Sequence, residues 1–148
     1  MLIHLIWGVD WGFGVPMILF SLAFHVSGLV LLEWILISME RKRKKPRSIT
    51  YFLLAMLLCS NYILAMHVTE ATLWAALYYK VGALPDFQTA SLYSLNALTS
   101  YGHENLQLKD DWRLLGAIES MNGVMIFGLS TAFLFNAMRE QRPVRQAH

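Results

Sequence analysis

The chain has 148 residues, of which 56% are hydrophobic, 13% aromatic and 15% charged. Soluble domains average about 25% charged residues, so this composition excludes an ordinary soluble enzyme and a disordered chain. The single cysteine, Cys59, lies inside an apolar run, which excludes a disulfide framework and a cysteine-based metal site. The net charge of +2 is small, so where the charges lie matters more than their sum. The composition therefore predicts an all-α integral membrane protein.

Three apolar runs are each long enough to cross a hydrocarbon core of about 30 Å. They extend from about Val15 to Met39, from about Ile49 to the Tyr78-Tyr79-Lys80 stretch, and from about Trp112 to Phe135. Each is predicted to be a transmembrane helix, because lipid offers no water to satisfy backbone donors and acceptors. Pro16 is expected in the first turn of the first helix, where its missing N–H costs little.

The cationic residues predict the orientation. Nine of the twelve Lys and Arg lie in the hinge over residues 41–47 or in the tail at Arg139, Arg142 and Arg145, and the other three are Lys80, Lys109 and Arg113. By the positive-inside rule the hinge and the C-terminus are cytoplasmic and the N-terminus is outside, in a plasma (bacterial inner) membrane. The hinge is either a topology signal alone or also a site for anionic lipid head groups. Nothing predicts a nucleic-acid partner.

The segment between the second and third spans is too apolar for an exposed loop. Asp86 is a plausible N-cap, and Phe87 to Leu98 then form about three helical turns with leucines at helical spacing. Twelve residues cover only about 18 Å, too little to cross the bilayer, and a polar run from Thr99 to Asn105 follows. This order predicts a re-entrant loop that encloses a cavity only when several copies surround an axis. The alternative is a surface helix followed by an ordinary extracellular turn.

From about Tyr51 to Phe135, the order of outer helix, short helix, Thr-rich loop and inner helix resembles the pore module of the tetrameric, two-transmembrane potassium-channel family. The small bacterial channel-like branch of that family, with one extra N-terminal span, is the best match. The matching parts are Leu92-Tyr93-Ser94, Thr99-Ser100-Tyr101-Gly102 and the inner-helix run WRLLGAIESMNGVMIFGLSTAFLF. The resemblance divides the chain into 1–48 (first helix and hinge), 49–137 (pore module) and 138–148 (tail). It implies a homotetramer that conducts K⁺ or Na⁺, is not an enzyme and holds no resident cofactor.

The family's filter pattern is Thr-Thr-Val-Gly-Tyr-Gly-Asp. Matched without a gap, Thr99 and Ser100 stand on its two hydroxyl residues and Gly102 on its first glycine, while Tyr101, His103 and Glu104 replace its valine, its tyrosine and its second glycine. A second register places Tyr101-Gly102 on the final Tyr-Gly; either way one filter glycine is missing. Carbonyls of Thr99, Ser100 and Tyr101 are expected to hold the monovalent cation. With His103 and Glu104 at the mouth, potassium-over-sodium selectivity is expected to be weak.

Ionisable residues inside the spans suggest further roles, because charge is costly in a membrane. His67 and Glu70 share one helical face, and Glu119 is expected at the same depth. The three are predicted to form a hydrogen-bonded cluster that braces the pore helix through Ser91, Ser94 or Asn96. Interfacial solvation and a proton or ion relay are the alternatives. His25 is expected to be a helix-packing hydrogen-bond partner, and Glu33 a partner of the basic hinge.

Small residues along the third span allow close helix packing, and by resemblance Gly123, with Gly128 second, is the gating hinge. Two other functions stay open. One is a non-conducting scaffold or accessory subunit with a degenerate filter, which the missing glycine at Glu104 favours. The other is a haem- or metal-binding redox subunit using His25 and His67, which a difference in their expected depth disfavours.

Overall fold

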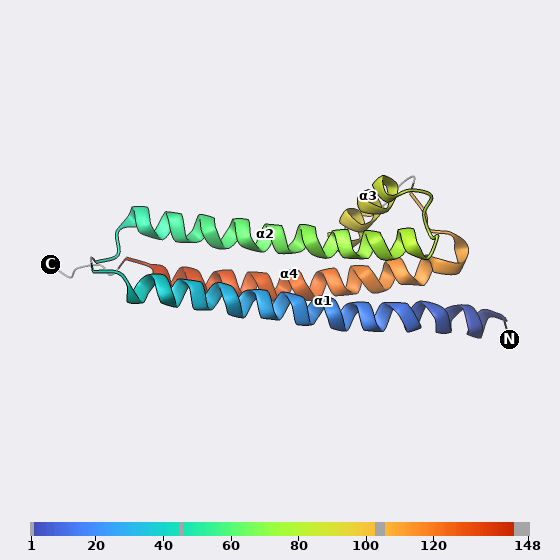
Figure 1. Ribbon diagram of the computed structural model, residues 1–148, viewed down its shortest axis with the longest axis horizontal. Helices are drawn as coiled ribbons and strands as arrows, with labels where there is room; N and C mark the ends of the chain where they lie inside the picture. Colours follow the sequence, from blue (N-terminus) through green and yellow to red (C-terminus); the bar gives the residue numbers. More distant parts are fainter. Residues whose placement is uncertain (1, 45, 103–105, 144–148) are drawn as a thin grey trace.

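The computed structural model describes residues 2–44, 46–102 and 106–143. All the secondary-structure elements of this part of the chain are helices (Figure 1). Three long helices lie side by side, and a short helix packs against two of them near the end of the bundle opposite the C-terminus. The two chain ends lie at opposite ends of the bundle, as three crossings require. In chain order the elements are α1 (Leu2–Arg41), α2 (Ile49–Lys80), α3 (Phe87–Leu98), the 3-10 helix η1 (Asp110–Trp112) and α4 (Arg113–Gln141).

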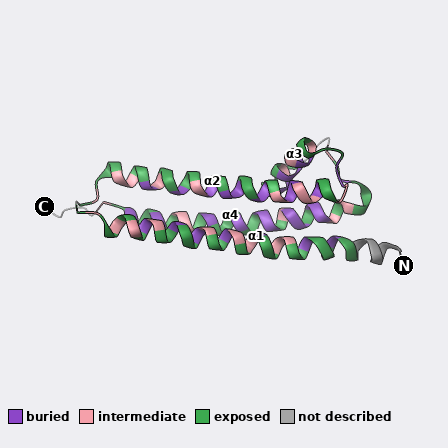
Figure 2. Ribbon diagram, in the orientation of Figure 1, coloured by how far each residue is buried: buried purple, intermediate pink, exposed green. Residues whose placement is uncertain are grey.

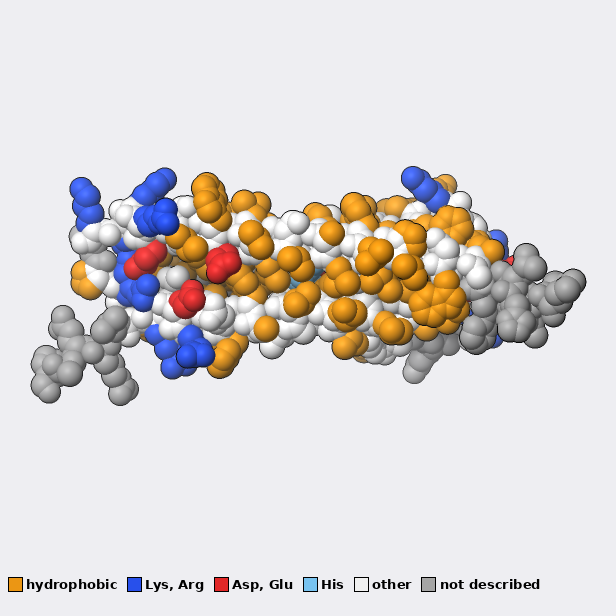
Figure 3. All heavy atoms as spheres, turned by 90° about the horizontal axis from the view of Figure 1, so that it is seen from below, with side chains coloured by type: hydrophobic (Ala, Val, Ile, Leu, Met, Phe, Trp, Pro, Cys, Tyr) orange, Lys and Arg blue, Asp and Glu red, His pale blue; other side chains and the backbone are white. Residues whose placement is uncertain are grey.

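The long helices have the length and apolar character of membrane spans. Suitable segments are Gly8–Arg41, Ile49–Lys80 and Asp110–Gln141, so the chain is a multi-pass membrane protein. Exposed residues lie along all three long helices (Figure 2), and they include large apolar ones such as Trp34 and Val124, each 65% exposed. Figure 3 shows a broad hydrophobic band, with most of the visible Lys, Arg, Asp and Glu at one end of it. This distribution fits a lipid environment. Lipid tails are as apolar as these side chains, so no hydrophobic effect drives the exposed faces into the protein interior.

The first helix is longer than expected, and the prediction for Pro16 was wrong. The helix begins at Leu2 rather than near Val15, so Pro16 lies in its interior. A proline there leaves the carbonyl of the residue four positions earlier, Gly12, without its helical N–H donor. The apolar character of the preceding residues explains why the helix continues across this defect.

Both ends of α2 and the start of α4 are close to the expected ones, but α4 ends later than expected. Ser48 caps α2 by accepting a hydrogen bond from the Tyr51 N–H at 3.2 Å, and α4 extends beyond Phe135 to Gln141. In the hinge, Glu40 pairs with Arg43 and Arg47 at N–O distances of 3.5 and 3.2 Å. The predicted partner of the hinge was Glu33, but the ion pairs described at the hinge use Glu40, about two helical turns closer.

The short helix α3 has the bounds and the cap that the sequence predicts. Asp86 is the N-cap, and its carboxylate accepts hydrogen bonds from the backbone N–H and the hydroxyl of Thr89, both at 2.8 Å. Of the three leucines at helical spacing, Leu92 and Leu95 are exposed and Leu98 is buried. The buried residues are mostly small: Ala90, Tyr93, Ser94, Ala97 and Leu98. Small side chains let α3 lie close to α2 and α4.

Acid should weaken the start of α3. The Thr89 N–H, followed by the Thr89 hydroxyl, holds the pKa of Asp86 below its usual value. A lowered folded-state pKa means that the cap stabilises the helix fully above the unfolded-state value and loses this effect as the pH falls through the folded-state value. Asp86→Asn keeps a good cap but removes the charge. Amide hydrogen exchange of residues 87–98, corrected for intrinsic rates, should become faster in acid for the wild type and not for Asp86→Asn. Equal acid responses would contradict this role of Asp86.

Candidate functional site

The C-terminal end of α3 reaches far into the bundle. The backbone carbonyl of Leu98 contacts Gly123 so closely that a Cβ atom at Gly123 would overlap it. Leu98 is buried and packs in a cluster with Ala71 of α2 and Ile126 of α4. Gly123 is ten residues from the start of α4, which corresponds to about 15 Å along the helix axis. The end of α3 therefore lies deep in the bundle, well along α4 from the end at which α4 begins.

The loop after α3 begins with a left-handed turn. Ser100 has φ 54° and Gly102 φ 90°. The Ser100 N–H donates to the Ala97 carbonyl and the Tyr101 N–H to the Asn96 carbonyl, both at 3.0 Å, which is the Schellman pattern of a helix end. The Thr99 hydroxyl donates to the Leu95 carbonyl at 2.7 Å and so points back along α3.

The backbone after this turn is exposed in the single chain. The residues over 99–102 are all exposed, Tyr101 to 84%. Among the described residues, no hydrogen-bond donor contacts the carbonyl oxygens of Thr99, Ser100 or Tyr101. The other two predicted filter residues, His103 and Glu104, lie outside the described residues.

A buried polar cluster around Glu119 joins α2, α3 and α4. The Tyr78 hydroxyl donates to Glu119 Oε2 at 2.6 Å, and Ser94 Oγ lies 2.5 Å from Glu119 Oε1. Ser94 Oγ is also 2.7 Å from the carbonyl of Ala71 in α2. Tyr78, Ser94 and Glu119 are all fully buried. Because Ser94 is the α3 member, this cluster fixes the short helix to both of its neighbours.

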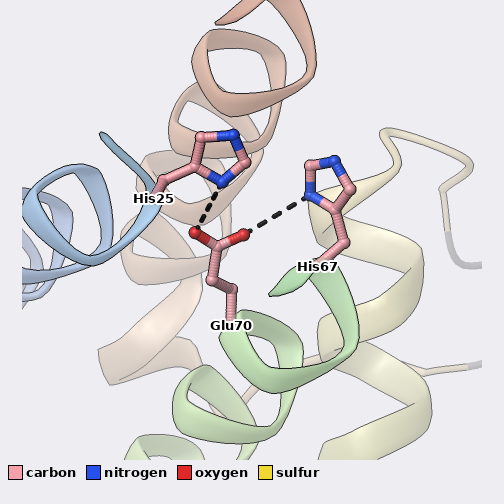
Figure 4. A group of neighbouring side chains, drawn as sticks. All are labelled: His25, His67 and Glu70. Carbon is pink, nitrogen blue, oxygen red and sulfur yellow. Dashed lines mark hydrogen bonds and ion pairs between the residues drawn. The ribbon is translucent and has the colours of Figure 1, made fainter. Parts of the chain in front are cut away.

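A second buried cluster lies elsewhere in the bundle and contains two of the three predicted bracing residues. Glu70 Oε1 is 3.0 Å from His25 Nδ1, and Glu70 Oε2 is 3.4 Å from His67 Nδ1 (Figure 4). On the opposite side of both rings, Ser130 Oγ lies 3.0 Å from His25 Nε2 and 3.1 Å from His67 Nε2. These contacts join α1, α2 and α4.

The predicted grouping of His67, Glu70 and Glu119 is thus divided between two clusters. Glu119 binds Ser94, one of its expected partners, but the hydrogen bonds described for it include neither His67 nor Glu70. His67 and Glu70 instead contact His25, with the two imidazole rings 5.3 Å apart. The expected difference in depth between His25 and His67 was wrong. His25 lies 16 residues before the end of α1 at Arg41, and His67 lies 18 residues after the start of α2 at Ile49, so both are at a similar distance from the hinge that joins the two helices.

Two further polar residues connect α1 and α4. The Asn122 side-chain amide donates to Ser21 Oγ at 2.9 Å, and both residues are buried. The sequence shows that both polar residues lie in apolar helices. It does not show that they form a pair, because this depends on how each helix is rotated about its axis. This hydrogen bond holds α1 against the same stretch of α4 that contacts the end of α3.

The two candidate hinge glycines have different surroundings. Gly123 faces the Leu98 carbonyl, as described above, whereas nothing lies within 4 Å of a Cβ atom placed at Gly128. Gly116 resembles Gly123 in this respect, because the Tyr93 side chain occupies the space that a Cβ atom at Gly116 would need. Gly116 and Gly123 therefore allow α3 to pack closely on α4, and hinge roles for Gly123 and Gly128 stay predictions.

Comparisons with known proteins add no family to this description. No known protein family matches the chain, and no curated protein or solved structure matches it. The function has to be argued from the residues and their geometry.

Proposed function

We propose that the chain is one subunit of a homotetrameric pore-loop cation channel. In this proposal α3 is the pore helix, the backbone over 99–102 forms the inner part of the filter, and α4 is the inner helix. Monovalent cations, K⁺ or Na⁺, pass down their electrochemical gradient between four copies of the loop. From the sequence alone, we assign His103 and Glu104, which lie outside the described residues, to the outer mouth.

The observation that carries the proposal is the depth at which α3 ends. Its last residue, Leu98, contacts Gly123 about 15 Å along α4, and exposed backbone follows whose carbonyls over 99–101 accept no hydrogen bond from any described residue. Non-helical backbone inside a membrane is tolerated only where protein buries it or water surrounds it. Neighbouring copies around a hydrated axis would supply both, and rings of carbonyl oxygens are what a dehydrated cation requires.

The buried cluster at Glu119 supports the same proposal. A filter has to hold its oxygens in place against the pull of a passing ion, so its supporting helix must be fixed. Glu119 and Ser94 connect α3 to α4, and the Ala71 carbonyl connects it to α2. We assign bracing of the pore helix to Glu119.

The outward apolar face of α4 is available for contacts between subunits. Met121, Val124 and Met125 are exposed to 60%, 65% and 51% in the single chain. The inner helices of a four-fold pore pack against neighbouring copies through residues of this kind, while α1 and α2 retain outward apolar faces for lipid. Localisation to the plasma membrane, with the basic hinge on the cytoplasmic side, belongs to this proposal.

Ion flux tests the proposal directly. Purified chain in liposomes should carry K⁺ and Na⁺ with similar permeability, measured as dye-reported flux and as a bi-ionic reversal potential. Gly102→Ala should reduce the flux at least about ten-fold, since alanine resists the positive φ of Gly102. Gly12→Ala is the matched control, because nothing lies within 4 Å of its Cβ position.

The outcomes separate the alternatives. A folded tetramer without flux would favour the non-conducting scaffold over a channel. Strong selectivity for K⁺ would contradict the weakened filter, and unchanged flux in Gly102→Ala would remove the loop from the conduction pathway.

A further inference from the structure

The buried cluster of His25, His67 and Glu70 takes no part in the proposed conduction pathway. Its three side chains come from α1 and α2, and Figure 4 shows the two imidazoles and the carboxylate turned toward one another. One ligand atom from each residue can be chosen so that all three lie within 4.8 Å of one another. His25 and Glu70 are fully buried and His67 is 8% exposed.

The distances are close to those around a bound transition-metal ion. Tetrahedral Zn²⁺ with ligand bonds of 2.0–2.1 Å places neighbouring ligand atoms about 3.3–3.4 Å apart. The two histidine Nδ1 atoms lie 3.0 and 3.4 Å from different Glu70 oxygens, and one ligand atom from each residue lies within 4.8 Å of the others. Binding of one ion therefore requires the side chains to move closer together.

Ser130 occupies the position of an outer-sphere partner. A metal-binding histidine usually donates its other ring N–H to an oxygen, which fixes the ring orientation. Ser130 Oγ lies within 3.1 Å of both Nε2 atoms, and a hydroxyl oxygen has two lone pairs that can accept both N–H groups. In this tautomer neither Nδ1 atom carries a proton. The lone pairs of both Nδ1 atoms then face Glu70 and are available to bind a cation.

Without a cation the same cluster is incompletely satisfied. Glu70 Oε2 and His67 Nδ1 are buried and 3.4 Å apart, and neither has a hydrogen-bond partner among the described residues. Ser130 has a single proton, so it cannot donate to both rings. A divalent ion would satisfy both orphaned atoms at once.

We propose that His25, His67 and Glu70 form a binding site for a divalent transition-metal ion of the Zn²⁺ type, with Ser130 as the shared outer partner. The ligand set of two imidazoles and one carboxylate suits Zn²⁺ and Co²⁺ rather than K⁺ or Mg²⁺. Rings 5.3 Å apart at a 32° tilt leave no space for a haem between them. The metal would tie α1 to α2 inside the bundle.

Co²⁺ and Zn²⁺ binding to the purified full-length chain in detergent tests this site. The background variant carries His4→Ala, His103→Ala and His148→Ala, which leaves His25 and His67 as the only histidines. After chelator treatment and dialysis, this variant should bind one Co²⁺ per chain, with visible absorption of tetrahedral type that Zn²⁺ abolishes. Zn²⁺ should also raise the melting temperature.

Variants then assign the ligands. Glu70→Gln and His67→Ala should abolish stoichiometric Co²⁺ binding, and Ser130→Ala, which removes only the outer partner, should weaken it about 10–100-fold. Ser21→Ala is the matched control, because it breaks the α1–α4 hydrogen bond to Asn122 without touching the cluster. Helical circular dichroism checks folding in each case.

The proposal is overturned when the folded background variant binds no Co²⁺ or Zn²⁺, or when Ser130→Ala, Glu70→Gln and His67→Ala all bind as the background does. These readouts are independent of ion flux, so the metal site and the channel can each fail alone.

Discussion

Gly123→Ala is expected to lower the free energy of unfolding by about 2–3 kcal/mol, the upper part of the range for an overpacked site. The new methyl group would overlap the backbone carbonyl of Leu98, which cannot rotate away as a side chain can. Thermal or SDS-induced unfolding in detergent, followed by circular dichroism, measures the loss. Cation flux in liposomes should fall with it, because displacing Leu98 displaces the adjacent loop.

Gly128→Ala is the control for this prediction. It lies in the same helix with nothing within 4 Å of its Cβ position, so the better helix propensity of alanine should leave stability unchanged or raise it by up to about 1 kcal/mol. Equal effects of the two substitutions would show that α3 does not pack against Gly123. A flux lost only in Gly128→Ala would instead assign the hinge to that position.

Glu119→Ala is expected to lower the free energy of unfolding by about 1–3 kcal/mol, because it leaves the buried Tyr78 hydroxyl with only the Leu115 carbonyl, 3.5 Å away, as an acceptor. Tyr78 and Ser94 both lose the carboxylate, although Ser94 keeps the Ala71 carbonyl. Glu119→Gln retains one carbonyl oxygen and should cost about half as much. Both substitutions should reduce flux, because the brace between α3 and α4 is weakened.

Glu33→Ala provides the comparison, because Glu33 is an exposed glutamate on α1 and exposed substitutions change stability by no more than about 0.5 kcal/mol. Unfolding in detergent and flux in liposomes are again the readouts. Unchanged stability and conductance in Glu119→Gln would remove the bracing role assigned to this residue.

The fold class and most helix ends follow from local sequence signals. Apolar length predicts the three spans, and Asp86 marks the start of α3 in the sequence as it does in the structure. Pro16 was misleading because a proline can lie inside a helix when the apolar residues before it have no alternative in lipid. Local rules place such a proline at a helix start.

The pairing of polar residues was less predictable than their presence. His67, Glu70 and Glu119 were recognised as unusual, yet their partners depend on how far α1 and α4 are shifted along α2 and on how each helix is rotated. Counting from the hinge at the end of α1 and the start of α2 places His25 and His67 at similar levels, whereas treating each span separately does not.

The leucines of α3 illustrate a related limit. Their helical spacing is real, but a membrane protein can expose Leu92 and Leu95 and bury Ala90 and Ala97 instead. In lipid, close packing favours small side chains at the contact, and apolar character alone does not identify the inner face. The glycines at positions 116 and 123 mark the contact better than the leucines do.

The central claim is that several copies of the chain surround one axis, and the mass of the assembly tests it most directly. Native mass spectrometry of the full-length protein released from lipid nanodiscs should give about 68 kDa, four times the 16.9 kDa of one chain. A mass of one chain alone, from protein that is helical and folded in the same nanodiscs, would contradict the channel.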